Sequence, residues 1–194
     1  SSISLTSMPV FASAYFPPLA YVAQLLSNPE VILDLKEHFV KQSVRTRAEL
    51  LAANGLVQIN VPIVHLSGQK QCMEQIRIDS SSNWQSEHWR TIESAYSNAP
   101  YFEHYALDIR QIYAQKHAYL HELNSAILTW INTCLGLNLN IQISDAYTGR
   151  TPSDKKMWLG RTLEPTTPYQ QVFVDKANFV ANLSVLDGLM NEGP

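Results

Sequence analysis

The residues best suited to binding a charged ligand form a short basic cluster early in the chain. Lys41, Arg45 and Arg47 lie within seven positions, next to Gln42, although the whole chain has only 14 Lys and Arg residues. In an extended strand the three side chains would share one face, and in a helix Lys41 and Arg45 would lie one turn apart. Guanidinium groups bind carboxylates and phosphates through paired hydrogen bonds. The pattern predicts either a site for a small anion or an ordinary solvated strand face.

A histidine within residues 84–93 is the candidate for proton transfer. Imidazole exchanges protons near neutral pH, so His88 is the predicted catalytic residue, acting as a general base. Trp84, His88 and Tyr96 recur at helical spacing, which equally fits a hydrogen-bonded core histidine among buried aromatic side chains. In the functional interpretation, Trp84 and Tyr96 shape the substrate pocket.

Tyr15 is the last candidate for the pocket. It follows an apolar, strand-like segment and precedes Pro17 and Pro18. Ligands of α/β sheets bind beyond the carboxyl ends of the strands. Tyr15 is therefore expected either to line a pocket or to fix a strand-to-helix corner.

Motifs for metals and common cofactors are missing from the sequence. His117 and His121 are four positions apart, but nothing supplies a third ligand, so no metal site is predicted. Glycine-rich phosphate loops and a GxSxG nucleophile elbow are also missing. The cofactor, if there is one, stays unknown at this level.

Composition limits the class of protein. Of the 194 residues, 45% are hydrophobic and 16% are charged, so the chain has enough apolar content to fold around a core. Seventeen acidic residues against 14 basic ones give a net charge of −3, which argues against general nucleic-acid binding. No apolar run reaches the ~20 residues that cross a bilayer, and no signal peptide is recognised. Two cysteines without a CxxC pair fit a reducing cytoplasm.

The elements that position these residues follow from periodicity and turn residues. Asn54-Gly55 joins two alternating segments and predicts a hairpin whose turn uses the positive φ angles of this pair. Residues 148–168, rich in Pro, Gly and charge, predict a long mobile loop. The expected strands are 8–14, 31–35, 47–52, 57–64, 76–78, 139–143 and 170–174, and the expected helices are 19–26, 84–97, 101–113, 117–134 and 183–190.

Strand and helix segments interleave, and this predicts an α/β fold. We expect a mixed sheet with an inserted β-hairpin, flanked by helices, in a single domain covering residues 1–194. The alternative is an α+β arrangement in which hairpin and helices form separate layers.

Taken in order, these segments resemble the WbqC-like family. The most telling stretches are residues 15–21 (YFPPLAY), 38–43 (HFVKQS) with Arg45 and Arg47, and residues 83–85 (NWQ). The matched positions include Tyr15, Pro17, Lys41, Gln42, Arg45, Arg47, Pro62, Trp84, His88, Tyr96 and Pro100. Many family members have an aspartate and a tyrosine near the matched glutamine, where this chain has His38 and Ser43.

The resemblance implies a biochemical setting. Some family members lie in bacterial O-antigen clusters, so we expect a cytoplasmic transferase that moves an aminoacyl, glycyl or acyl group in surface polysaccharide (lipopolysaccharide) biosynthesis. Its substrate would be small and anionic or sugar-linked, with no nucleic-acid partner, and the oligomeric state is not predicted. The alternative is a non-catalytic binding protein for a glycan, nucleotide or peptide. Convergence of the candidate residues on one closed pocket would favour the enzyme, and dispersal over an open surface would favour the binding protein.

Overall fold

The computed structural model describes residues 8–147, 171 and 183–194. Its first layer is a parallel sheet of three strands in the order β1 (Val10–Phe11), β2 (Glu30–Leu33) and β5 (Asn140–Ile143). Helix α1 (Leu19–Ser27) connects β1 to β2, so the strand–helix–strand unit expected from the sequence is confirmed.

The first strand is shorter than predicted, because the chain turns away from the sheet after Phe11. The backbone N–H of Tyr15 donates to the carbonyl of Val44, and Phe16 has a positive φ of 36°. These contacts belong to the corner before Pro17 and not to a strand ladder.

The predicted hairpin is confirmed as β3 (Arg47–Ala52) and β4 (Gly55–Asn60), which pair antiparallel from Arg47 opposite Asn60 to Ala52 opposite Gly55. The second strand begins two residues earlier and ends four residues earlier than the predicted 57–64, because its pairing with β3 extends from Gly55 to Asn60. The turn differs in one detail. Only Gly55, with a φ of 112°, has the left-handed conformation, whereas Asn54 does not. Among the described residues the hairpin forms a sheet of its own, so the α/β fold contains two sheets.

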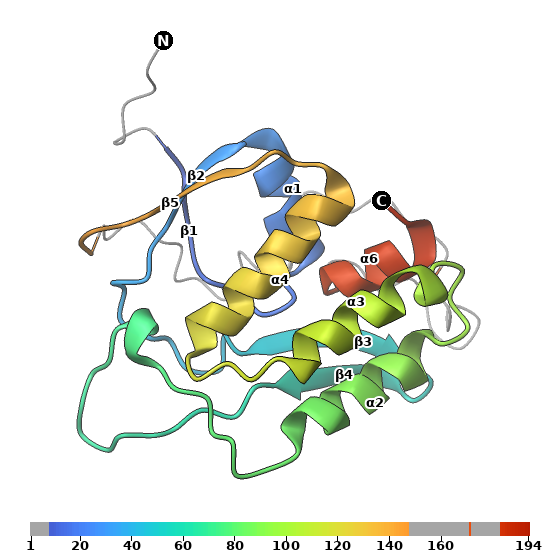
Figure 1. The fold of residues 1–194 in the computed structure, drawn as a ribbon, viewed down its shortest axis with the longest axis horizontal. Coiled ribbons are helices and arrows are strands. Elements are labelled where there is room, and N and C mark those ends of the chain that lie inside the picture. Colours follow the sequence, from blue (N-terminus) through green and yellow to red (C-terminus); the bar gives the residue numbers. More distant parts are fainter. Residues whose placement is uncertain (1–7, 148–170, 172–182) are drawn as a thin grey trace.

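Four longer helices and one short 3-10 helix complete the described structure. They are α2 (Trp84–Tyr96), α3 (Phe102–Ala114), α4 (Leu120–Leu135), α6 (Val185–Glu192) and η1 (Met73–Gln75). Figure 1 shows α2 beside the hairpin, α4 under the parallel sheet and α3 between α2 and α4. Helix α6 packs against α1, α3 and β3.

Helix α4 begins later than predicted, because residues 117–119 pair with residues 76–78. The N–H of Ile78 donates to Ala118, the N–H of Leu120 donates to Ile76, and Arg77 and Tyr119 form an isolated bridge. For the same reason residues 76–78 form bridges and not the expected strand. Gly136 ends α4 in the left-handed conformation, which glycine adopts without a steric cost.

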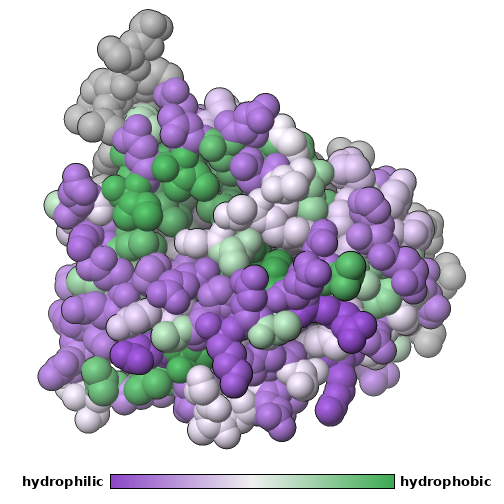
Figure 2. All heavy atoms as spheres, in the orientation of Figure 1, coloured by the Kyte–Doolittle hydropathy of each residue, from purple (hydrophilic) through white to green (hydrophobic). Residues whose placement is uncertain are grey.

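One continuous apolar core joins the elements from both sheets, and it includes Tyr15, Trp84 and Tyr96. Figure 2 shows a largely hydrophilic face on which apolar side chains gather near the parallel sheet, where Ile143 is 60% exposed. No helix in the described ranges is long and apolar enough to cross a membrane. The loop predicted at 148–168 and all of the strand predicted at 170–174 except Gln171 lie outside the described residues.

Candidate functional site

Two adjoining cavities, which we call the basic groove, open between residues 38–47 and residues 60–76. The small lobe has a volume of about 280 Å³, and the large lobe about 780 Å³. Both lobes are lined by Phe39, Lys41, Ile63 and His65, so they form one continuous groove. The small lobe is completed by Gln42, Thr46, Arg47, Asn60, Val61 and Pro62, and the large lobe by His38, residues 64 and 66–71, and Ile76.

The described lining of the basic groove contains two lysines, one arginine and two histidines. Arg47 lines the small lobe, Lys70 and His38 line the large lobe, and Lys41 and His65 line both. Among the residues that the structure describes, no aspartate or glutamate lines either lobe. A small anion would meet cations there without competition from a carboxylate of the lining.

The turn before β3 determines which predicted basic residues reach the basic groove. Ser43 Oγ donates to the carbonyl of Val40, while the N–H groups of Thr46 and Arg47 donate to the carbonyl of Ser43. Gln42 adopts a positive φ of 55°. The segment is therefore a tight turn, and it divides the predicted stripe: Lys41, Gln42 and Arg47 line the groove, but Arg45 does not.

Arg45 lies in the core, where its guanidinium is bound by a carboxylate of the chain itself. Its Nε lies 2.6 Å from Glu37 Oε1, its Nη2 lies 2.9 Å from Glu37 Oε2, and its Nη1 donates to Ser43 Oγ at 3.2 Å. Arg45 is 1% exposed and Glu37 4%. The paired hydrogen bonds expected for a substrate anion are thus made to Glu37.

His88 lies in the core within a chain of hydrogen bonds. Nε2 lies 3.0 Å from the carbonyl of Asn60, and Nδ1 lies 2.7 Å from the hydroxyl of Tyr15, which lies 2.5 Å from that of Tyr113. A carbonyl can only accept, so Nε2 carries the proton and Nδ1 accepts from Tyr15. The chain of donors therefore runs from Tyr113 through Tyr15 and His88 to Asn60.

Burial favours the uncharged form of every side chain in this network. Desolvation lowers the pKa of His88 from 6.5 to about 4, although the bond to the Asn60 carbonyl acts in the opposite direction. Burial also raises the pKa of Tyr15 and of Tyr113 well above the usual range. At neutral pH His88 is a neutral imidazole with both nitrogens engaged, and it holds Asn60 in the wall of the small lobe.

The two remaining predicted pocket residues lie apart from the basic groove. Trp84 packs edge-on against His88, with ring centroids 5.2 Å apart, and its indole nitrogen has no hydrogen-bond partner among the described residues. Tyr96 donates to Asp187 Oδ1 at 3.0 Å, and Gln171 donates to the other oxygen of this buried carboxylate at 2.9 Å. Thus Tyr15, Trp84 and His88 form one buried cluster, and Tyr96 belongs to the contact with α6.

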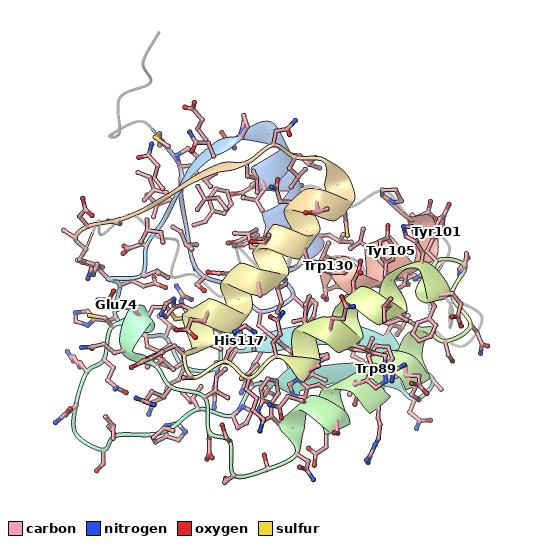
Figure 3. All side chains as sticks on the ribbon, viewed as in Figure 1. Glu74, Trp89, Tyr101, Tyr105, His117 and Trp130 are labelled. Carbon is pink, nitrogen blue, oxygen red and sulfur yellow. The ribbon has the colours of Figure 1, made fainter. Side chains whose placement is uncertain are left out.

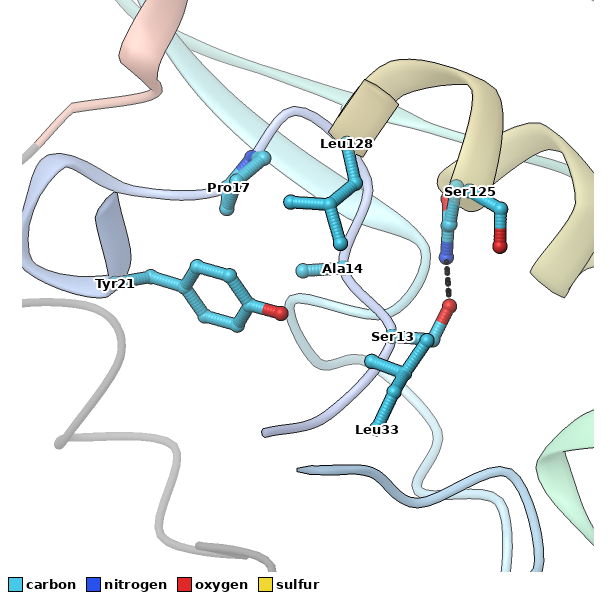
Figure 4. A pocket seen from close by; sticks show the side chains of 8 residues that line it. Ser13, Ala14, Pro17, Tyr21, Leu33, Ser125 and Leu128 are labelled. Carbon is cyan, nitrogen blue, oxygen red and sulfur yellow. Dashed lines mark hydrogen bonds between the residues drawn. The ribbon is translucent and has the colours of Figure 1, made fainter. Parts of the chain in front are cut away.

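Near the carboxyl end of β1, where the sequence allowed either a pocket or a strand-to-helix corner, lies a water-sized cavity of about 10 Å³. Figure 4 shows this cavity with Ser13, Tyr21 and Leu128 around it. Asn124 donates to Ser13 Oγ at 3.1 Å and to the backbone carbonyl of Arg45 at 3.1 Å, which closes the space. The basic groove is therefore the more suitable place for a substrate.

The two histidines considered as metal ligands do not share a helix. His117 lies in the connection before α4 (Figure 3), and His121 lies within α4. Within the described ranges no group of three or more His, Cys, Asp or Glu side chains is arranged to hold a metal ion.

Sequence reasoning missed His65, Lys70 and Asn60 as members of the groove. His65 directly follows the apolar segment predicted at 57–64, and this position at the end of a strand was the available signal. Lys70 lies in a polar segment without periodicity, so only the tertiary structure identifies it as a lining residue.

Comparison with known proteins gives a family and an uncharacterised relative. The model of the WbqC-like protein family matches residues 12–167. "Uncharacterized protein Rv1507c" of Mycobacterium tuberculosis (strain ATCC 25618 / H37Rv) is 28% identical over 139 residues, which are 71% of this chain and 60% of the relative. The chain thus spans about three fifths of the length of this relative. No solved structure matches the chain significantly.

Proposed function

The chain belongs to the WbqC-like protein family, and from this premise we propose that it is a cytoplasmic transferase of bacterial surface-polysaccharide (O-antigen) biosynthesis. Its substrate is an anionic, sugar-linked molecule that binds in the basic groove. The observation that carries the proposal is the joint presence of Lys41, Gln42 and Arg47 in one lobe, in whose lining the described residues include no carboxylate.

The roles of these residues follow from their chemistry. Arg47 donates two hydrogen bonds to a phosphate or carboxylate, Lys41 adds a positive charge, and Gln42 supplies an amide donor. In acyl or aminoacyl transfer, an amine or hydroxyl attacks the acyl carbonyl and loses a proton, and the leaving group departs with the electrons of the broken bond. Cations near the reacting carbonyl stabilise the negative charge that develops on its oxygen.

The role of His88 as a general base remains a prediction. Its two ring nitrogens are bonded to Tyr15 and Asn60, so accepting a substrate proton requires one of these bonds to open. The closed arrangement supports a positioning role, in which His88 holds the Asn60 wall of the small lobe.

A non-catalytic binding protein for a glycan, nucleotide or peptide is the second candidate. The observation that favours it is the distribution of the predicted residues: Lys41 and Arg47 line an open groove, but Arg45 and His88 are committed to contacts inside the core.

The test is a binding screen followed by a turnover assay. We expect a nucleotide sugar or another phosphate-bearing compound to raise the melting temperature of the chain, and Lys41→Gln and Arg47→Gln each to weaken its binding about tenfold. Arg90→Gln, which removes an exposed charge on α2, is the matched control and should bind normally.

Transfer of a labelled aminoacyl or acyl group to the bound sugar compound would support the enzyme. Binding that depends on Arg47 but gives no transfer with any donor would support the second candidate, and binding insensitive to both variants would exclude the basic groove.

A further inference from the structure

We propose that His65 is a third cationic group of the small lobe, and that its protonation makes the affinity of the basic groove for oxyanions depend on pH. This inference rests on the proposed anion site. It gives His65 a role in proton binding that is distinct from the general-base role predicted for His88.

The first argument is position. His65 is the only imidazole that lines both lobes, and it is exposed to solvent. The backbone immediately before it is held in place, because the N–H of Val64 donates to the carbonyl of Arg77 and Ile63 pairs with Ile78 in a bridge. The imidazole of His65 is thus presented to the groove from an anchored backbone.

The second argument is the charge of the neighbouring groups. Lys41 and Arg47 line the small lobe together with His65, and His38, Lys41 and Lys70 line the large lobe with it. Glu49 follows Arg47 along β3 and shares with it the lining of another cavity, of about 10 Å³, and Glu49 accepts a hydrogen bond from Gln58. Glu49 lines neither lobe, and among the described residues no acidic side chain is part of the groove lining.

The third argument is thermodynamic linkage. Neighbouring cations disfavour a proton on an imidazole, and an anion bound among them favours it. Proton binding and anion binding must then strengthen each other by the same factor. Histidine is the side chain whose charge ordinarily changes between about pH 5 and pH 8, whereas Lys and Arg keep theirs.

The other histidines provide internal comparisons. His88 is enclosed in the core, and both of its nitrogens are bonded. His38 lines only the large lobe, where its ring lies 5.9 Å from that of Tyr147. Of the histidines, His65 alone lines the small lobe together with Lys41 and Arg47.

The test uses sulfate as the probe, because its charge does not change in this pH range. Sulfate affinity of the full chain is measured by calorimetry at about pH 5.5 and about pH 8, with circular dichroism to verify that each variant is folded. We expect wild type to bind sulfate about fivefold more tightly at the lower pH, the effect of one added charge at a solvated site. His65→Gln should abolish this ratio.

Two variants keep the outcomes separate. Arg47→Gln should weaken sulfate binding at both pH values and keep the ratio. His104→Gln, which removes an exposed histidine of α3 that lines neither lobe, should keep both the affinity at pH 8 and the ratio. If the difference in sulfate affinity between the two pH values persists in His65→Gln, the proposed role of His65 is wrong. The same holds if wild type binds sulfate equally well at both pH values. In either case the anion site itself is retained. Absence of sulfate binding at both pH values overturns the anion site as well.

Discussion

Arg45 and Glu37 form a bidentate ion pair inside the core, with Nε 2.6 Å from Oε1 and Nη2 2.9 Å from Oε2. The two well-aligned hydrogen bonds of this buried pair compensate for the desolvation of both charges. Without its partner, either side chain would be a buried, unpaired charge. Residues 37–45 are therefore anchored through their two ends, and this places the Lys41–Gln42 turn at the rim of the basic groove.

Removing one partner of this pair should destabilise the chain strongly. For Arg45→Met we expect a loss of about 3–5 kcal/mol in the free energy of unfolding, because Glu37 is left as an unpaired buried carboxylate. The measurement is denaturant unfolding. The double variant Glu37→Leu with Arg45→Met should recover much of the loss, and equal instability of the single and double variants would contradict the account.

The two arginines of the predicted cluster should differ in their effects. Arg47→Gln should change the unfolding free energy by no more than about 0.5 kcal/mol, because Arg47 is only half-buried at the start of an edge hairpin. It should weaken oxyanion binding, whereas Arg45→Gln should act mainly on stability. Thermal unfolding with and without added sulfate separates the two effects, and a stability loss of equal size in both variants would refute this division.

Acid should destabilise the chain through His88. Its pKa is about 4 in the folded chain and about 6.5 when exposed, so the unfolded state binds more protons between these values. The stability contributed by the neutral imidazole is complete above about pH 6.5 and is lost as the pH falls toward 4, up to about 3 kcal/mol.

The check is the difference in unfolding free energy between wild type and His88→Gln as a function of pH. His88→Gln removes the titration of His88. The carboxylates titrate in both proteins, so their contribution cancels in the difference. The difference in unfolding free energy should narrow as the pH falls from 6.5 to 4. A difference that does not change with pH would show that the pKa of His88 is the same in the folded and unfolded chain.

The hydroxyl of Tyr15 should matter more to stability than that of Tyr113. Tyr15→Phe leaves both His88 Nδ1 and the Tyr113 hydroxyl without their partner, and we expect a loss of about 2–3 kcal/mol. Tyr113→Phe leaves the Tyr15–His88 bond in place and should cost about 1 kcal/mol. Chemical denaturation of both variants provides the comparison, and the reverse order of the two losses would contradict the central position of Tyr15 between His88 and Tyr113.

Local patterns were sufficient for most elements. The helix with Trp84, His88, Ile92 and Tyr96 at four-residue spacing has the predicted buried face, since α2 buries these side chains. The hairpin follows from alternation in residues 57–61 and from Gly55 at its turn. These features depend on neighbours within a few positions, and periodicity reports them directly.

What the sequence by itself determined is therefore the α/β class, the bounds of most elements and the short list of residues able to bind an anion or move a proton. Only the tertiary structure decided which of them meet a substrate. Arg45 is buried and paired with Glu37. Both ring nitrogens of His88 are hydrogen-bonded, to Tyr15 and Asn60. His65, from the 61–72 segment, lines the same lobe as Lys41 and Arg47. The physical reason is that pairing and burial depend on partners outside the local period, from eight positions apart for Glu37 and Arg45 to 73 for Tyr15 and His88, and no periodicity of the sequence encodes them.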